Sequence, residues 1–142
     1  MSADKKAVEL FLESVRPPHL PKRENAIFVF EDEMQGRKWA SREQRNLYIV
    51  ELKPNCILHR ADWCWLSVIM SGLMKKDPKT AVYANNYWAG ETTERPVWEL
   101  LVSSATVVEE INIPQQERTR HRCEAHSQPD PCSLIPSVAP IE

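Results

Sequence analysis

The chain has 142 residues, the length of one domain, and its 42% of hydrophobic residues is enough for a core and too high for wholly disordered chain. The formal net charge of −2 gives no overall electrostatic footprint for nucleic acid or an anionic membrane, although a local basic patch is compatible with it. The three glycines are too far apart for a G-x-G-x-x-G turn or a Walker A loop, so both phosphate-binding loops are excluded.

The N-terminal segment has no apolar stretch typical of a secretory signal, because charges stand at Asp4, Lys5 and Lys6. No part of the chain approaches the run of about 18 apolar residues that a bilayer crossing needs. We therefore expect a soluble, cytoplasmic protein with no membrane partner.

The first half of the chain predicts two helices that alternate with two strands. Apolar residues recur at helical spacing over residues 4–16, and the prolines at 17 and 18 end this helix. Residues 26–30 form a short apolar run typical of a buried strand. Acidic residues then favour the start of a helix over residues 32–45, and alternating side chains predict a strand over residues 46–52.

The second half continues this mixed pattern. A short strand is expected at residues 56–60, then a helix over residues 61–73 with Asp62 as its N-cap. The pattern of residues 80–88 leaves their structure open, with a helical turn as one alternative. Strands are predicted at residues 97–102 and 105–111. This order of elements favours an α+β fold with a small sheet.

The composition changes after Ile113, since five of the eleven prolines lie in residues 114–142, together with few large apolar residues. We therefore expect a folded domain over residues 1–113 and a disordered tail over residues 114–142. A zinc site in this tail is the alternative, although its spacing of ligands differs from paired finger units. The four candidate zinc ligands are His121, Cys123, His126 and Cys132.

Glu99 is the most informative acid, because it interrupts the apolar segment VWELLV. A carboxylate in such a strand is costly to bury unless it faces a cleft or a partner. The alternative is an edge strand with Glu99 on its solvent face. Alternation places Val97 and Leu101 on the same face as Glu99, which fits that alternative poorly. A functional role and a purely structural role for Glu99 therefore both stay open.

Several other side chains have two interpretations. Tyr48 suits either a core position on its strand or stacking against a planar ring. Arg16 and Arg23 flank a proline-rich loop that holds His19, and arginine forks suit phosphate or carboxylate groups, although exposed arginines are common. The adjacent Tyr87 and Trp88 fit either a pocket wall or a packed anchor.

Five segments follow one another between about residues 10 and 111: FLESVRPPHLPKRENAIFVFED, WASREQRNLYIVEL, HRADWCW, YWAGETTERPVWELLV and ATVVEEI. In this order they resemble a small, mostly uncharacterised bacterial and phage family with an ADP-ribosyltransferase-like fold. The resemblance implies a split β-sheet with flanking helices that holds NAD as a substrate. It also implies a transferase, specifically a glycosyltransferase, that acts as a toxin, phage effector or defence enzyme. The implied partners are a protein or nucleic-acid acceptor and a cognate inhibitor or antitoxin.

The same resemblance assigns roles to particular residues. Arg16 or Arg23 would hold the phosphates of NAD, with His19 as a substitute. Tyr48 would lie near the nicotinamide. Glu99 would contact the nicotinamide ribose, where a fixed carboxylate stabilises the positive charge that develops when the glycosidic bond breaks.

The resemblance also predicts the pocket walls. Phe28 and Trp88 would help to wall the pocket, whereas Trp39, Trp63 and Trp65 are expected in the core. The chain has no E-x-E or Q-x-E pair at Glu99 that would supply an acid to activate the acceptor. This difference favours an alternative function, in which a catalytically inactive module of the same fold binds a protein or nucleic-acid partner.

Overall fold

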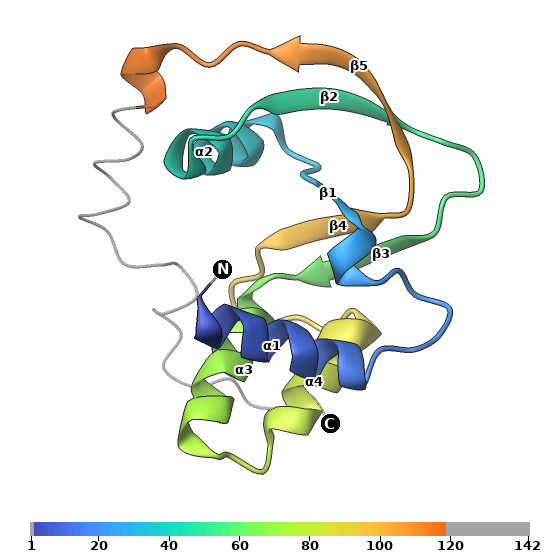
Figure 1. The fold of residues 1–142 in the computed structure, drawn as a ribbon, viewed down its shortest axis with the longest axis vertical. Helices are drawn as coiled ribbons and strands as arrows, with labels where there is room; N and C mark the ends of the chain where they lie inside the picture. The colour runs from blue at the N-terminus through green and yellow to red at the C-terminus, as the bar shows by residue number, and fades with distance from the viewer. Residues whose placement is uncertain (1, 119–142) are drawn as a thin grey trace.

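A computed structural model describes residues 2–118, which form an α+β fold of helices and two small antiparallel sheets (Figure 1). The α+β class expected from the sequence is confirmed. The rest of the predicted tail, including the four candidate zinc ligands, lies outside the described residues. None of the helices within residues 2–118 has the length and apolar character that a bilayer crossing requires.

The larger sheet has three strands in the order β1-β4-β3, all antiparallel to their neighbours. Its strands are β1 (Ile27–Val29), β4 (Trp98–Val102) and β3 (Leu58–Asp62). The central strand β4 is almost entirely buried, and its Glu99 pairs with Ala61 of β3. Because paired residues of an antiparallel sheet share a face, Glu99 and Ala61 project to the same side.

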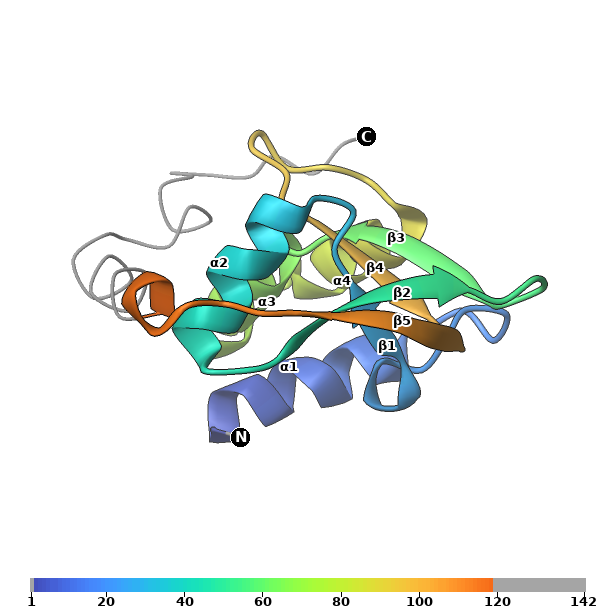
Figure 2. The same cartoon turned by 90° about the horizontal axis from the view of Figure 1, so that it is seen from above.

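The smaller sheet pairs β2 (Leu47–Leu52) with β5 (Ala105–Ile111), and its register shifts between Ile49 and Val50. Only Ser103 and Ser104 separate β4 from β5, so one extended segment passes from the first sheet to the second. Ile57 fixes this passage, since its carbonyl accepts from the Ser103 N–H at 2.9 Å and its own N–H donates to the Ser103 hydroxyl at 2.8 Å. Figure 2 shows β2 and β5 side by side in this smaller sheet.

Three helices pack together against the larger sheet: α1 (Ala3–Ser14), α3 (Cys64–Lys75) and α4 (Thr80–Ala89) (Figure 1). The fourth helix, α2 (Glu33–Glu43), lies beside the smaller sheet at the opposite end of the molecule. The main core lies among the first three helices and β3. It comprises Val8, Leu12, Ala61, Trp65, Ile69, Tyr83, Ala84, Tyr87 and Trp88.

The structure differs from the sequence expectations at several places. Strand β1, expected to be buried, lies at the edge of the larger sheet and leaves Ile27 40% and Phe28 47% exposed. Residues 80–89, whose structure the sequence pattern left open, form the helix α4. The third strand lies at residues 58–62, so Asp62 ends a strand instead of belonging to the helix that follows. Residues 115–118, expected in the disordered tail, form a helical turn in which Arg118 donates to the Arg45 carbonyl at 3.1 Å.

Candidate functional site

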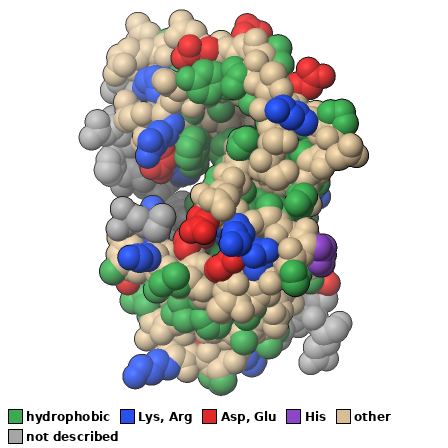
Figure 3. All heavy atoms as spheres, turned by 45° about the vertical axis from the view of Figure 1, so that its right-hand side comes forward, with side chains coloured by type: hydrophobic (Ala, Val, Ile, Leu, Met, Phe, Trp, Pro, Cys, Tyr) green, Lys and Arg blue, Asp and Glu red, His purple; other side chains and the backbone are tan. Residues whose placement is uncertain are grey.

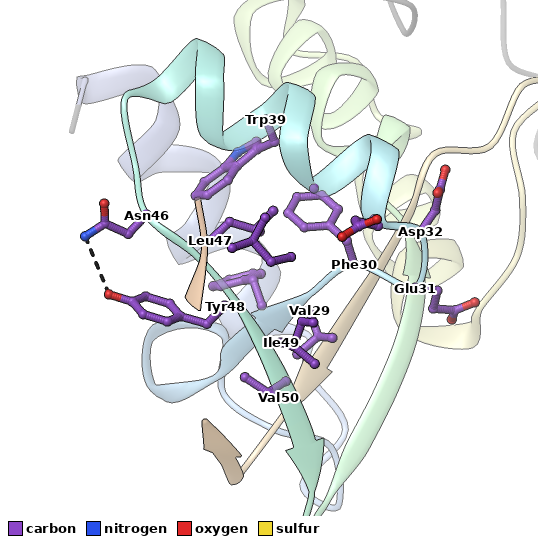
Figure 4. Close-up of a pocket in the computed structure, with 14 residues that line it drawn as sticks. Val29, Phe30, Glu31, Asp32, Trp39, Asn46, Leu47, Tyr48, Ile49 and Val50 are labelled. Carbon is purple, nitrogen blue, oxygen red and sulfur yellow. Dashed lines mark hydrogen bonds between the residues drawn. The ribbon is translucent and has the colours of Figure 1, made fainter. Parts of the chain in front are cut away.

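A pocket of about 370 Å³ opens between β1, α2 and β2 (Figure 4). Four aromatic residues line it: Phe28, Phe30, Trp39 and Tyr48. Figure 4 shows Trp39 and Tyr48 on opposite sides of Leu47. Apolar walls with a few polar groups are typical of small-molecule sites.

The close approach of α2 to β2 forms one wall of this pocket. Asp32 caps the helix by accepting from the Met34 N–H at 3.1 Å. Gly36 faces β2, and a Cβ atom there would lie only 3.3 Å from a methyl group of Leu47. One turn later, Trp39 packs on Phe30 with 5.7 Å between the ring centroids.

A second, more open hollow of about 540 Å³ adjoins this pocket at the end of α2. It is lined by Trp39, Gln44, Arg45, Asn46 and Tyr48. Tyr48 is 44% exposed, and the Asn46 amide donates to its hydroxyl at 3.5 Å. Trp39, Asn46 and Tyr48 line both cavities, so the pocket and the open hollow share a wall. Figure 3 shows the molecule from another side, where hydrophobic side chains lie around a depression in the surface.

A buried polar network lies where η1 (Arg23–Asn25) meets α1, α4 and β4. Arg23 is 7% exposed and donates through Nη1 to Oε1 of Glu99 and to the hydroxyl of Tyr87. Its Nε donates to Glu9 of α1 at 2.8 Å. Tyr87 in turn donates its hydroxyl proton to Oε1 of Glu99 at 2.6 Å. The network therefore joins residues that are far apart in the sequence.

The charges in this network support one another. Burial alone would lower the pKa of Arg23, but the neighbouring Glu99, with Tyr87 and Glu9, outweighs burial and holds this pKa above its usual value. Burial and the nearby Glu99 carboxylate raise the pKa of Tyr87. Tyr87 therefore keeps its proton at neutral pH and remains a donor.

Phe28 connects the pocket to this network. It is one of the pocket-lining residues, and the guanidinium carbon of Arg23 lies 5.1 Å from the centroid of its ring. This distance is within the range of a cation–π interaction. Phe28 therefore contacts Arg23 while it also lines the cavity that contains Tyr48.

His59 of β3 lies beside the network. Its Nε2 is 3.1 Å from the carbonyl oxygen of Tyr87, and its ring lies 5.2 Å from that of Trp88. Burial lowers the pKa of His59, and the charge on Arg23 lowers it further. Trp88, expected to wall the pocket, is 5% exposed in the core and donates its indole N–H to the Leu12 carbonyl at 2.9 Å.

The other proposed phosphate ligands lie elsewhere. Arg16 follows α1, where its Nε donates to Glu13 at 2.9 Å and its Nη1 to the Leu20 carbonyl at 2.7 Å. His19 is exposed in the same loop. Within residues 2–118, no hydrogen bond or ion pair joins either residue to Arg23 or Glu99.

The structure thus brings together Arg23, Glu99 and Phe28, whereas Tyr48 lies in the pocket, which neither Arg23 nor Glu99 lines. The sequence pattern alone does not indicate Glu9 or the partnership of Tyr87 with Glu99. Trp39, expected in the core, lines both cavities. The signal available for Tyr87 was its hydroxyl, because a buried tyrosine usually has a hydrogen-bond partner.

Asp62 has a wider role than the expected helix cap. Its Oδ1 accepts from the N–H groups of Cys64 and Val97, each at 3.0 Å. Its Oδ2 accepts from both the N–H and the hydroxyl of Thr93, each at 2.7 Å. This fully buried carboxylate connects the loop before β4 to the start of α3 through hydrogen bonds, so its role is to stabilise the fold.

No cluster of three or more His, Cys, Asp or Glu side chains within residues 2–118 is arranged to hold a metal ion. No curated protein and no solved structure matches the chain. Residues 2–113 match a family described as "Protein of unknown function (DUF2441)". This match covers most of the sequence, and the chain therefore belongs to the DUF2441 family.

Proposed function

We propose that this protein is an NAD-dependent ADP-ribosyltransferase that modifies a macromolecular acceptor. In this proposal, NAD binds in the pocket between β1, α2 and β2. The observation that carries it is the position of Phe28, which lines this pocket and also lies against Arg23, the partner of Glu99. A pocket with aromatic residues and a fixed carboxylate are thereby linked through one residue, Phe28.

The proposed reaction breaks the bond between nicotinamide and its ribose, and nicotinamide leaves with the bonding electrons. The ribose carbon then carries a developing positive charge, which a fixed carboxylate stabilises. Oε1 of Glu99 is held by Arg23 and Tyr87, whereas Oε2 accepts no hydrogen bond from residues 2–118. In the proposal, Oε2 binds a ribose hydroxyl. A nucleophile of the acceptor forms the new bond to the ribose carbon and loses its proton.

The aromatic walls have a separate task in this proposal. Tyr48 and Phe28 offer planar surfaces to the nicotinamide ring and reduce the access of water. Arg23 lies between the carboxylates of Glu9 and Glu99, so both sides of its guanidinium group are occupied. We therefore assign Arg23 the positioning of Glu99 rather than the binding of phosphate.

The test measures NAD binding by calorimetry, together with nicotinamide release and transfer from radiolabelled NAD. Wild type is expected to bind NAD and release nicotinamide. Glu99→Gln keeps the size of the side chain, so it should bind NAD but lose activity by at least about tenfold, the effect of about 1.4 kcal/mol of transition-state stabilisation. Glu94→Gln is the matched control, because Glu94 is exposed on the loop before β4. Folded wild type that neither binds nor cleaves NAD would exclude this function.

The second candidate is a catalytically inactive module that binds a protein or nucleic-acid partner. It is favoured by the enclosure of Glu99, whose side chain is 9% exposed and whose Oε1 already accepts from two donors. In this case, folded wild type releases no nicotinamide, and Glu99→Gln binds the partner as wild type does. A loss of partner binding in folded Glu99→Gln would contradict this alternative.

A further inference from the structure

The C-terminal half of α2 is basic although the whole chain has a net charge of −2. Lys38 and Arg42 are four residues apart and therefore lie on one face of this helix. Arg45 is the second residue after the end of the helix, and all three side chains are exposed. Arg37, the other basic residue here, is less exposed and lies 3.6 Å from Glu117. The basic patch, defined as Lys38, Arg42 and Arg45, thus faces solvent.

This basic patch adjoins the open hollow that contains Trp39 and Tyr48. Arg45 is one of the residues that line this hollow, together with the side-chain amides of Gln44 and Asn46. Aromatic faces beside cationic side chains are the arrangement with which proteins bind unpaired bases and their phosphates. Amide side chains can add hydrogen bonds to base edges.

The acidic groups around the hollow limit where a phosphate can lie. Glu110 pairs with Tyr48 across the smaller sheet, and Glu43 lies 3.9 Å from Arg42. Glu31, Asp32 and Glu33 line the far end of the adjoining pocket. A phosphate is therefore favoured only on the side of Arg45, where no carboxylate of residues 2–118 forms an ion pair with this arginine.

We infer that this surface binds a single-stranded nucleic acid, with a base in the open hollow against Trp39 and the adjacent phosphate on Arg45. A purely acidic peptide would satisfy the basic patch but not the aromatic faces. A duplex keeps its bases stacked and would not enter the hollow. The shared wall of Trp39 and Tyr48 places this base next to the pocket proposed for NAD. The role of this nucleic acid as the acceptor of ADP-ribosyl transfer rests on the proposed function. Its binding to this surface does not depend on that function.

The experiment measures the fluorescence anisotropy of labelled oligonucleotides without NAD. The probes are single strands of about ten thymidines or uridines, a duplex of equal length and an acidic peptide. Both single strands are expected to bind more tightly than the duplex and the peptide, with affinity that falls as salt rises. Arg45→Gln should weaken binding about threefold or more and reduce the salt slope by about 1. Trp39→Leu should weaken binding about fivefold or more, whereas Trp39→Phe retains a ring and much of the affinity.

Two further variants test the charge argument. Glu110→Gln removes a carboxylate beside the hollow and should strengthen binding. Lys75→Gln, on α3 at the opposite end of the molecule, should leave it unchanged. The inference is overturned if neither single strand binds at low salt, or if the acidic peptide or the duplex binds as tightly as the single strands. It is also overturned if Lys75→Gln weakens binding as much as Arg45→Gln does. Oligonucleotide binding without nicotinamide release would exclude the proposed enzymatic function but not nucleic-acid binding at this surface. Nicotinamide release without oligonucleotide binding would exclude only nucleic-acid binding at this surface.

Discussion

The Tyr87 hydroxyl donates to Oε1 of Glu99 at 2.6 Å and thereby joins helix α4 to the central strand β4. Arg23 donates to the same oxygen from a position 76 residues earlier in the chain. Two donors on one oxygen hold the carboxylate in a single orientation. This arrangement allows a charged side chain to stay in a strand whose other residues are apolar.

The first prediction concerns the stability that depends on Glu99. Glu99→Ala removes the main partner of the buried Arg23 and leaves the Tyr87 hydroxyl without its acceptor. Breaking a buried ion pair from one side typically costs about 3–5 kcal/mol, because a charge stays buried without compensation. Urea denaturation followed by tryptophan fluorescence measures this loss.

The control for Glu99→Ala is Glu13→Ala, which breaks the ion pair between Glu13 and Arg16 near the surface. Exposed ion pairs contribute little, so this variant should unfold at nearly the wild-type urea concentration. Equal midpoints for the two variants would show that the network around Glu99 does not stabilise the fold.

The sequence predicts most elements of the fold, and α4 is the main element that its pattern leaves open. Helix α4 has no single apolar stripe, because it is buried on several sides at Thr80, Tyr83, Asn86 and Trp88. Its stability comes from packing against α3 and β3 rather than from an amphipathic pattern. A helix buried in this way leaves little periodic signal in its own sequence.

The same limit applies to the site. The sequence identified Arg23 and Glu99 separately by their residue types, but their contact depends on how η1 folds back over α1 and β4. It also suggested a pocket role for Trp88, which the packing of α1 and α4 encloses. Trp39 is at the pocket because Gly36, one turn earlier, lets α2 approach β2 closely. These are long-range relationships that local patterns do not determine.

The second prediction concerns Asp62, which accepts four hydrogen bonds. Asp62→Asn replaces one acceptor oxygen by an NH₂ group that faces other donors. At least one buried N–H then loses its partner, and we expect a loss of about 2–4 kcal/mol in the free energy of unfolding. Asp32→Asn makes the same chemical change at the exposed cap of α2, where asparagine caps as well as aspartate. A similar small effect at both positions would contradict this role for Asp62.

The third prediction concerns the contact between α3 and α4 at Gly72. A Cβ atom on Gly72 would overlap the hydroxyl oxygen of Thr80, which is held in place by a hydrogen bond of 2.6 Å to the Asp77 carbonyl. Gly72→Ala should therefore destabilise the protein by about 1–3 kcal/mol, although alanine is the better helix former. Thr80→Ala in the same chain should restore part of this loss, since it removes the overlapping atom. Without such recovery in thermal denaturation, a direct clash is not the cause.

The fourth prediction is a pH dependence that arises from His59. Because burial lowers the pKa of His59 in the folded protein, the unfolded chain takes up its proton first as the pH falls. The stabilisation from neutral His59 is thus fully present above about pH 6.5 and is lost as the pH falls from there to the lowered pKa. Urea denaturation at about pH 7.5 and pH 5.5 should show this loss in wild type and a smaller one in His59→Phe. An imidazole NMR titration of folded protein with a midpoint above about 6.5 would refute this assignment.

The fifth prediction tests Phe28 as the link between the pocket and Arg23. Phe28 is 47% exposed, so Phe28→Ala should destabilise the fold only modestly. Under the proposed function, it should weaken NAD binding several-fold, because it removes a pocket wall and the ring that covers Arg23. Ile27→Ala is the matched control: Ile27 neighbours Phe28 on β1 and is 40% exposed, but it does not line the pocket. Calorimetry that finds equal NAD affinity in the two variants would separate the pocket from the Arg23–Glu99 pair and leave Glu99 with a structural role alone.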